Sequence, residues 1–180
     1  MSSIISIGYR LFLRPLLFRL PPEAAQKVAE LALRRRLVWR VFAPVFRVQD
    51  QRLSVDFCGL RLTNPVGIAA GFDKNCEILP SLEALGFGYL VGGTVTESPQ
   101  SGNPKPRMIR YINQQSLINA LGFPGNGLHN ATRHLEHARR ILGDTAIVVS
   151  TSGTSINEIV RCHRQLETLA DIIELNISSP

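Results

Sequence analysis

The chain has 180 residues, 44% of them hydrophobic and 19% charged, a balance that is typical of a folded protein with one moderate core and excludes a disordered chain. The formal charge of +6 is concentrated at the start, because residues 1–47 carry nine Lys or Arg against two Glu and the remainder is nearly neutral. Cys58, Cys76 and Cys162 lie far apart, and their odd number argues against a disulfide framework and for a reducing compartment.

Residues 4–42 are expected to form amphipathic helices. Arg10, Arg14 and Arg19 interrupt the apolar start, so no run reaches the ~18 to 20 apolar residues that a membrane-spanning helix needs. The segment also has no small-residue cleavage pattern, so we expect no signal peptide. Pro21–Pro22 separates the early apolar piece from a second one, and two short helices are therefore predicted.

The charge pattern of this segment indicates what it contacts. Apolar stripes bordered by arginines suit helices that lie on an anionic membrane surface. Two alternatives are a helical pair packed on its own domain and a basic face that binds nucleic acid. Nucleic acid is disfavoured as a partner, because aromatic and basic residues do not alternate in the pattern of a single-strand-binding surface.

From Leu53 onward, strand and helix signals alternate. Residues 53–62 predict a hairpin that turns at Cys58–Gly59. The later segments predict four strands, over residues 66–70, 89–96, 146–152 and 171–179, and three helices, over residues 76–88, 129–142 and 156–170. Strands joined by helices imply a parallel α/β sheet, either open and doubly wound or part of a (β/α)8 TIM barrel. Both folds place their chemistry at the carboxyl ends of the strands.

Small and polar residues follow the four predicted strands, and acidic residues are nearly absent there. Ala70 and Gly71 leave the backbone open to close approach, and Lys74 adds one positive charge. Hydroxyl and amide groups can bind a polar heteroaromatic ring, whether flavin or pyrimidine, without a fixed charge beside it. The alternative is a set of ordinary polar turns with a solvated lysine. The other residues at these strand ends are Thr94, Ser150, Asn176, Ile177, Ser178 and Ser179.

Two further motifs carry weak signals. His134 and His137 are three residues apart on a predicted helix, but no third ligand lies nearby in the sequence, so we expect no metal. The glycine-rich stretch "GFPGNG" at residues 122–127 follows no clear strand, and turn formation explains it better than phosphate binding.

Several segments together resemble a known family. "NPVGIAAGFDKN", "GFGYLVGGTVTESPQSGNPKPRMIRY", "INALGFPGNG" and "IELNISSP" occur in this order and resemble the class 2, quinone-linked dihydroorotate dehydrogenases along nearly the whole chain. "RPLLFRLPPEAAQKVAELALR" resembles the N-terminal amphipathic helical pair of that class, which the soluble class 1 enzymes lack.

The resemblance implies both a fold and an activity. We expect residues 1–47 to form a helical domain for membrane contact and quinone access, and residues 48–180 to form the first half of an FMN-binding (β/α)8 barrel. The implied reaction oxidises dihydroorotate to orotate in the de novo synthesis of the pyrimidine nucleotide UMP. FMN would be its redox cofactor and a membrane quinone its electron acceptor. The implied location is peripheral, on the anionic cytoplasmic face of the cell membrane.

The resemblance also implies roles for individual residues. Ser179 would be the catalytic base, and Arg110 would lie at the mouth of the quinone tunnel. Lys74 and Asn176 would touch both flavin and substrate. The remaining flavin contacts would be Ala70, Gly71, Phe72, Asp73, Thr94 and Ser150, and the remaining substrate contacts Asn119, Ala120, Leu121, Gly122 and Phe123.

A serine base has a chemical requirement. Dihydroorotate must lose a proton from the ring carbon next to the one that gives up the hydride, so the base opposes the flavin across the ring. An alkoxide is too costly at neutral pH, so Ser179 would need water or hydroxyl relays in an enclosed site. Class 1 enzymes place cysteine at this position, and serine therefore supports class 2.

Some positions depart from the family pattern. "STSGT" stands where the family has "NIGKN", so Ser150 replaces an asparagine that contacts the flavin. Gln26 replaces a histidine that faces the quinone, and Ala120 replaces a common arginine. A full (β/α)8 barrel needs roughly 250 residues. We therefore expect these residues to supply the barrel only through its fourth strand and to be inactive alone. The alternative function is a catalytically incomplete, membrane-associated half-barrel that acts as a structural or interaction module, and the oligomeric state stays open.

Overall fold

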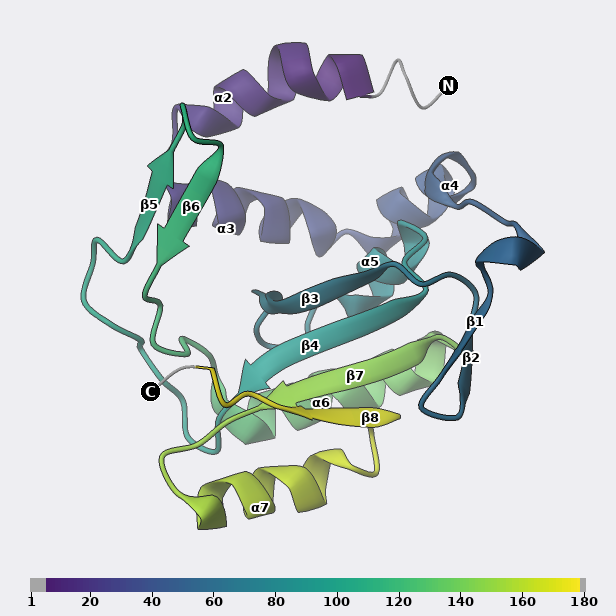
Figure 1. Cartoon of the computed structure of the whole chain (residues 1–180), viewed down its shortest axis with the longest axis vertical. Coiled ribbons are helices and arrows are strands. Elements are labelled where there is room, and N and C mark those ends of the chain that lie inside the picture. Colours follow the sequence, from purple (N-terminus) through teal and green to yellow (C-terminus); the bar gives the residue numbers. More distant parts are fainter. Residues whose placement is uncertain (1–5, 179–180) are drawn as a thin grey trace.

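A four-stranded parallel sheet forms the centre of the protein in the computed structural model, which describes residues 6–178 (Figure 1). The strands lie in the order β3, β4, β7, β8, so each new strand is added to the same growing edge. This arrangement confirms the predicted α/β class, with the four parallel strands and three intervening helices of a partial (β/α)8 barrel. The bounds are Gly67–Asp73 for β3, Tyr89–Val95 for β4, Ala146–Thr151 for β7 and Ile172–Leu175 for β8.

Three helices cover one face of this sheet and build the core. They are α5 (Leu79–Ala84), α6 (Gly127–Ile141) and α7 (Ile156–Leu166). Burying a leucine side chain contributes roughly 1.5–3 kcal/mol, so the buried leucines of the three helices hold them on the sheet. Leucines of all three helices pack against apolar residues of β4 and β7, and the fully buried ones are Leu79, Leu82, Leu90, Leu135, Ile147, Val149 and Leu166.

Helix α5 is shorter than the sequence predicted. Cys76 has φ of 57°, in the left-handed region, so it cannot belong to a right-handed helix. The segment before Leu79 is instead a turn, and the helix runs for only six residues.

The opposite face of the sheet lines a cavity of about 730 Å³. Its floor is made of residues from all four strands, among them Ala69, Tyr89, Val91, Val148 and Ile172. Parallel sheets are normally covered on both faces, and in a closed barrel this face points inward. Within residues 6–178, β3 pairs only with β4, and β8 pairs only with β7.

The N-terminal segment forms more helices than the two predicted. A π-helical segment (Tyr9–Leu13) continues into α2 (Arg14–Phe18), and α3 (Pro22–Leu33) and α4 (Arg36–Phe46) follow. The chain leaves the helical conformation at Arg35, with φ of −88° and ψ of 65°, and so separates α3 from α4. Within the described residues, we find no helix with the length and apolar content that crossing a membrane would demand.

The junction between α3 and α4 is closed by Trp39. Its indole Nε1 donates a hydrogen bond to the carbonyl oxygen of Ala32 at 2.9 Å, so the first turn of α4 is tied to the last turn of α3. The same ring lies 6.4 Å from the ring of Phe46 and packs against the edge of the core.

Two antiparallel hairpins accompany the sheet. The first, β1 (Val55–Phe57) and β2 (Leu60–Leu62), follows a 3₁₀ turn (Gln51–Leu53) and confirms the predicted turn at Cys58–Gly59. The second, β5 (Met108–Tyr111) and β6 (Ser116–Asn119), was not predicted. It stands beside α2 and α3 and leads the chain back to the ends of the parallel strands (Figure 1).

Candidate active site

Strand β3 ends in a stretch of backbone that is open to a cavity. Gly71 has φ of +92°, and a Cβ placed on it would meet no protein atom within 4 Å. Ala70 before it carries only a methyl group, and both residues line the cavity. A ligand can therefore lie directly against the main chain at this point, as the sequence suggested.

Lys74 follows immediately and separates two cavities. The larger one, about 550 Å³, lies at the carboxyl ends of the strands. The smaller one, about 130 Å³, lies between the sheet and α3. Lys74, Leu121 and Pro124 line both, and Lys74 is the only charged residue of the three.

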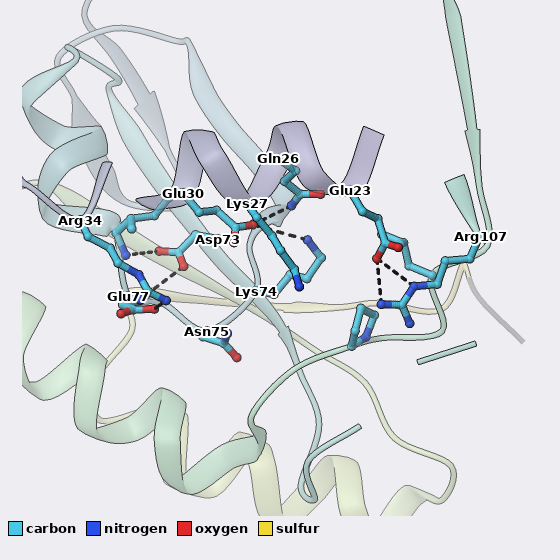
Figure 2. A pocket seen from close by; sticks show the side chains of 13 residues that line it. Glu23, Gln26, Lys27, Glu30, Arg34, Asp73, Lys74, Asn75, Glu77 and Arg107 are labelled. Carbon is cyan, nitrogen blue, oxygen red and sulfur yellow. Dashed lines mark hydrogen bonds and ion pairs between the residues drawn. The ribbon is translucent and has the colours of Figure 1, made fainter. Parts of the chain in front are cut away.

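Burial and nearby carboxylates have opposite effects on the charge of Lys74. Its side chain is 16% exposed, and burial lowers its pKa below the ordinary value. Carboxylates act in the other direction, above all that of Glu30 on α3, whose Oε1 lies 4.0 Å from Lys74 Nζ. Figure 2 shows this pair within a set of charged side chains between α3 and the barrel.

The carboxylate of Asp73 stabilises the turn that follows β3. Its carboxylate accepts hydrogen bonds from the backbone N–H groups of Glu77 and Ile78, each at 2.9 Å, and so holds the turn beyond β3. Burial raises the pKa of Asp73 to about 6, although the two N–H groups favour the charged form. The side chain is directed to the turn and the smaller cavity.

Three polar side chains connect the ends of β4, β7 and β8. Thr94 Oγ1 lies 3.1 Å from Ser150 Oγ, and the amide of Asn176 donates to Thr94 Oγ1 at 2.8 Å. The Oδ1 of Asn176 accepts from the backbone N–H and the hydroxyl of Ser178, at 3.1 and 2.8 Å. Asn176 is thereby fixed at both ends of its amide, which leaves Thr94 and Asn176 in defined positions on the cavity wall.

The loop after β6 closes the other side of the cavity. The backbone N–H of Ala120 donates to the carbonyl oxygen of Arg107 at 2.9 Å. Asn103 holds the same loop twice, because its amide donates to the carbonyl oxygen of Ala120 and its backbone N–H to that of Leu121, both at 2.9 Å. Phe123 has φ of 52°, which turns the chain toward α6.

Most of the predicted site residues meet at the larger cavity. Phe72 instead packs against the core, and Ser150 is fully buried behind Thr94. Neither they nor Asp73 line this cavity. Ser179, the predicted base, lies outside the described residues. The predicted residues that line it are Ala70, Gly71, Lys74, Thr94, Asn119, Ala120, Leu121, Gly122, Phe123 and Asn176.

Arg110 lies apart from this cavity, on β5. Its guanidinium carbon is 4.2 Å from the ring centroid of Phe18, and its Nη1 is 3.4 Å from the carbonyl oxygens of Phe18 and Leu20. It therefore joins the second hairpin to the end of α2. The tunnel-mouth role given to Arg110 stays a prediction.

Sequence reasoning missed three residues on the cavity wall, Asn103, Pro124 and Ser178. Asn103 precedes Pro104, and this pair of residues marks a turn. The turn signal alone does not reveal that the loop folds back over the strand ends. Ser178 was noted as a strand-end residue but was given no role.

The cavity wall combines hydroxyl and amide groups with one ammonium group, and it contains no carboxylate among the described residues. Such a wall suits a flat, polar, neutral or anionic ring. The open backbone at Gly71 leaves room for such a ring to lie against the main chain. His134 is hydrogen-bonded through Nδ1 to the carbonyl oxygen of Asn75 at 2.8 Å, and no group of three metal-binding side chains occurs within residues 6–178.

Comparisons with known proteins agree with this geometry. The family model described as dihydroorotate dehydrogenase matches residues 52–180. Dihydroorotate dehydrogenase (quinone) of Chloroflexus aurantiacus is 36% identical over 192 residues, which cover 100% of this chain and 53% of the relative. The enzyme of the same name from Thermus thermophilus is 39% identical over 175 residues, 91% of this chain and 51% of the relative.

Among solved structures, the crystal structure of DHODH from Eimeria tenella in complex with ferulenol matches with a TM-score of 0.77 and 29% identity. The match covers 92% of this chain and 47% of that one. The chain thus spans about half the length of the curated relatives it matches.

Proposed function

Because the chain belongs to the quinone-linked class of the dihydroorotate dehydrogenase family, we propose that it forms the N-terminal half of a site that oxidises dihydroorotate to orotate. The observation that carries the proposal is the meeting of Lys74, Asn119 and Asn176 on one cavity, although they come from three separate parts of the chain. The reaction belongs to pyrimidine biosynthesis, and a quinone is its final electron acceptor.

FMN is the proposed cofactor, and when bound it supplies the acceptor for the hydride of the substrate. Ala70 and Gly71 would let its ring system lie against the main chain. The Thr94 hydroxyl and the Asn176 amide would hydrogen-bond its polar edge. Lys74 would favour negative charge on that edge, since an ammonium in a site of low dielectric stabilises a nearby anion.

The substrate is held by complementary groups of the same wall. The ammonium of Lys74 pairs with the carboxylate of dihydroorotate, and the amide of Asn119 donates to and accepts from the pyrimidine ring. Asn176 donates its remaining N–H, because its other N–H and its oxygen bind Thr94 and Ser178. The backbone of the loop from Ala120 to Phe123 closes over the ring. The hydroxyl of Ser179, the proposed base, would take the proton released from the neighbouring ring carbon and pass its own proton to water or another hydroxyl.

The N-terminal helices supply the route for the electron acceptor. We propose that residues 1–47 form a unit that lies on an anionic membrane and admits quinone, and that residues 48–180 form the barrel part. Large apolar side chains remain exposed on these helices, beside a strong excess of arginine. Among them are Leu11, Phe12, Leu13, Leu16, Leu31, Leu37, Val38, Val41 and Phe42.

The proposal is tested by orotate binding to purified protein equilibrated with excess FMN. Lys74→Met removes the ammonium of the cavity, while Lys105→Met removes one that is exposed and outside it. We expect Lys74→Met to weaken orotate binding at least about tenfold, the effect of one lost charge-assisted contact of about 1.4 kcal/mol or more, and Lys105→Met to bind like the parent. Equal affinities of the two variants, or no orotate binding by the parent, would contradict the proposal.

A further inference from the structure

A carboxylate of the N-terminal helical unit reaches the lysine of the candidate site. Glu30 lies on α3, and its Oε1 is 4.0 Å from Lys74 Nζ, on the side of the smaller cavity (Figure 2). Among the described residues, no other carboxylate is recorded within 4.0 Å of this ammonium group. A residue outside the barrel is thus the nearest counter-charge of a residue inside it.

A hydrogen bond from a neighbouring side chain on α3 holds the carboxylate of Glu30 in position. Gln26 lies one turn earlier on α3, and its Nε2 donates to Glu30 Oε1 at 2.8 Å. This contact holds the carboxylate of Glu30 on the side of the barrel, with Lys74 opposite (Figure 2). Gln26 was noted in the sequence as a departure from the family pattern, and the structure shows what it contacts.

Most other charged groups around Lys74 have partners of their own, and Glu23 and Asp73 favour the charge of Lys74 less than Glu30 does. Glu23 on α3 binds Arg107 at 2.8 Å, and this arginine disfavours the charge of Lys74. Asp73 on β3 accepts two backbone hydrogen bonds. Three further charged groups line this cavity: Arg34 and Glu77, which pair with each other at 2.8 Å, and Lys27 on α3, a second cation on the side of Glu30.

We propose that Glu30 is a positioning residue, which keeps the ammonium group of Lys74 charged and directed along the wall between the two cavities. The proposal rests on the role given to Lys74 above and adds that docking of α3 sets the charge state of the site. A lysine buried without a counter-charge loses its proton more readily, and a neutral amine would not attract an anionic ring or a carboxylate.

The experiment measures the protonation of each lysine separately. The chain contains three lysines, Lys27, Lys74 and Lys105, so trace labelling with acetic anhydride over a pH series, read by mass spectrometry, gives a midpoint for each. The measurement uses the whole protein without FMN or orotate. Its result is therefore independent of whether orotate is the ligand, and the orotate experiment can fail separately.

Glu30→Gln keeps the shape of the side chain and removes its charge. We expect the labelling midpoint of Lys74 to fall by about one pH unit or more, the effect typical of losing an opposite charge at this distance, and that of Lys105 to stay unchanged. Glu30→Asp should restore part of the difference. The matched control is Glu77→Gln, which removes a carboxylate of the same cavity that pairs with Arg34, and it should leave Lys74 unaffected.

A second variant keeps the proposal testable if Glu30→Gln does not fold. Gln26→Leu leaves the carboxylate of Glu30 in place but removes the amide that directs it, and we expect a smaller fall in the Lys74 midpoint. The proposal is overturned if Lys74 titrates at the same pH in the parent, Glu30→Gln and Gln26→Leu proteins.

Discussion

Asn176 at the end of β8 donates its side-chain amide to Thr94 Oγ1 on β4 at 2.8 Å, across the end of the intervening strand β7. The hydroxyl of Thr94 also lies 3.1 Å from that of Ser150, so a single oxygen links three strands. This oxygen fixes the polar wall of the cavity before any ligand is present.

Thr94→Val should therefore destabilise the protein and loosen the wall. The substitution keeps the shape but leaves the amide of Asn176 and the buried hydroxyl of Ser150 without this partner. We expect the free energy of unfolding to fall by about 1–3 kcal/mol in urea denaturation. Thr168→Val, on the exposed end of the α7 region, should change it by less than about 0.5 kcal/mol, and equal losses would contradict the argument.

Gly71→Ala separates backbone strain from ligand contact. Gly71 and Gly59 both have positive φ, and a Cβ at either would meet no protein atom within 4 Å. Each alanine should cost about 1–2 kcal/mol of stability. Only Gly71 lines the cavity, so only Gly71→Ala should weaken FMN binding, as measured by equilibrium dialysis. A similar loss of FMN from Gly59→Ala, in the turn of the first hairpin, would refute a direct contact at Gly71.

Asp73 should make stability depend on pH. Its pKa is raised from 3.8 to about 6, so the folded state binds the proton more tightly than the unfolded one. The contribution of Asp73 to the free energy of unfolding is therefore largest below about pH 4 and falls by about 3 kcal/mol as the pH rises through 6. The stability difference between the parent and Asp73→Asn, measured from about pH 4 to 7, should show this fall. A difference that stays constant with pH would show that Asp73 is charged throughout.

Two Arg–Glu pairs between α3 and the barrel should differ in strength. The side chain of Arg107 is 10% exposed, and besides Glu23 it donates to the carbonyl oxygens of Ser101 and Asn103. The side chain of Arg34 is 52% exposed and binds Glu77. Arg107→Met should cost about 2–4 kcal/mol in thermal or urea unfolding, and Arg34→Met less than about 1 kcal/mol. Equal costs would show that burial does not decide the strength of these pairs.

Membrane binding should depend on the apolar face of α4. Leu37 and Val41 are each 75% exposed on α4, and Ile156 on α7 is 79% exposed. Replacing Leu37 and Val41 together by Glu should lower the fraction sedimenting with anionic vesicles at least about tenfold, because apolar burial and attraction to the surface are both lost. Ile156→Glu should sediment like the parent, and high salt should release much of the bound parent protein from the vesicles. Parent protein that stays in solution at low salt would disprove the membrane role.

The sequence was most informative where a single physical pattern decided the structure. The four parallel strands are short apolar runs closed by small or polar residues, and each begins within one residue of its predicted start. The predicted ends are less accurate, since β3 continues to Asp73 and β8 stops at Leu175, where Asn176 begins the polar turn. The hairpin of β5 and β6 was missed because its apolar residues, such as Ile109 and Ile118, are exposed. Its turn also places Gln115 at φ of 49°, where glycine or asparagine is the usual signal.

The sequence predicted which residues lie at the site better than it predicted what each of them contacts. Ten of the predicted contacts line one cavity, because parallel strands bring their carboxyl ends together. Asp73 and Ser150 have internal partners instead, and a list of polar residues cannot separate a buried hydrogen bond from a group that faces a cavity. Glu30 came from a distant helix, and only the docking of α3 on the barrel brings it to Lys74.

The chain contains a single tryptophan, Trp39, and it sits at the junction of α3 and α4. Its fluorescence therefore reports on that junction alone, without an attached dye and without background from the barrel when tyrosine is not excited. A change in emission on adding vesicles would assign the event to the N-terminal helices. Unfolding followed by this emission would likewise give the stability of their docking, which circular dichroism of the whole chain cannot separate from that of the sheet.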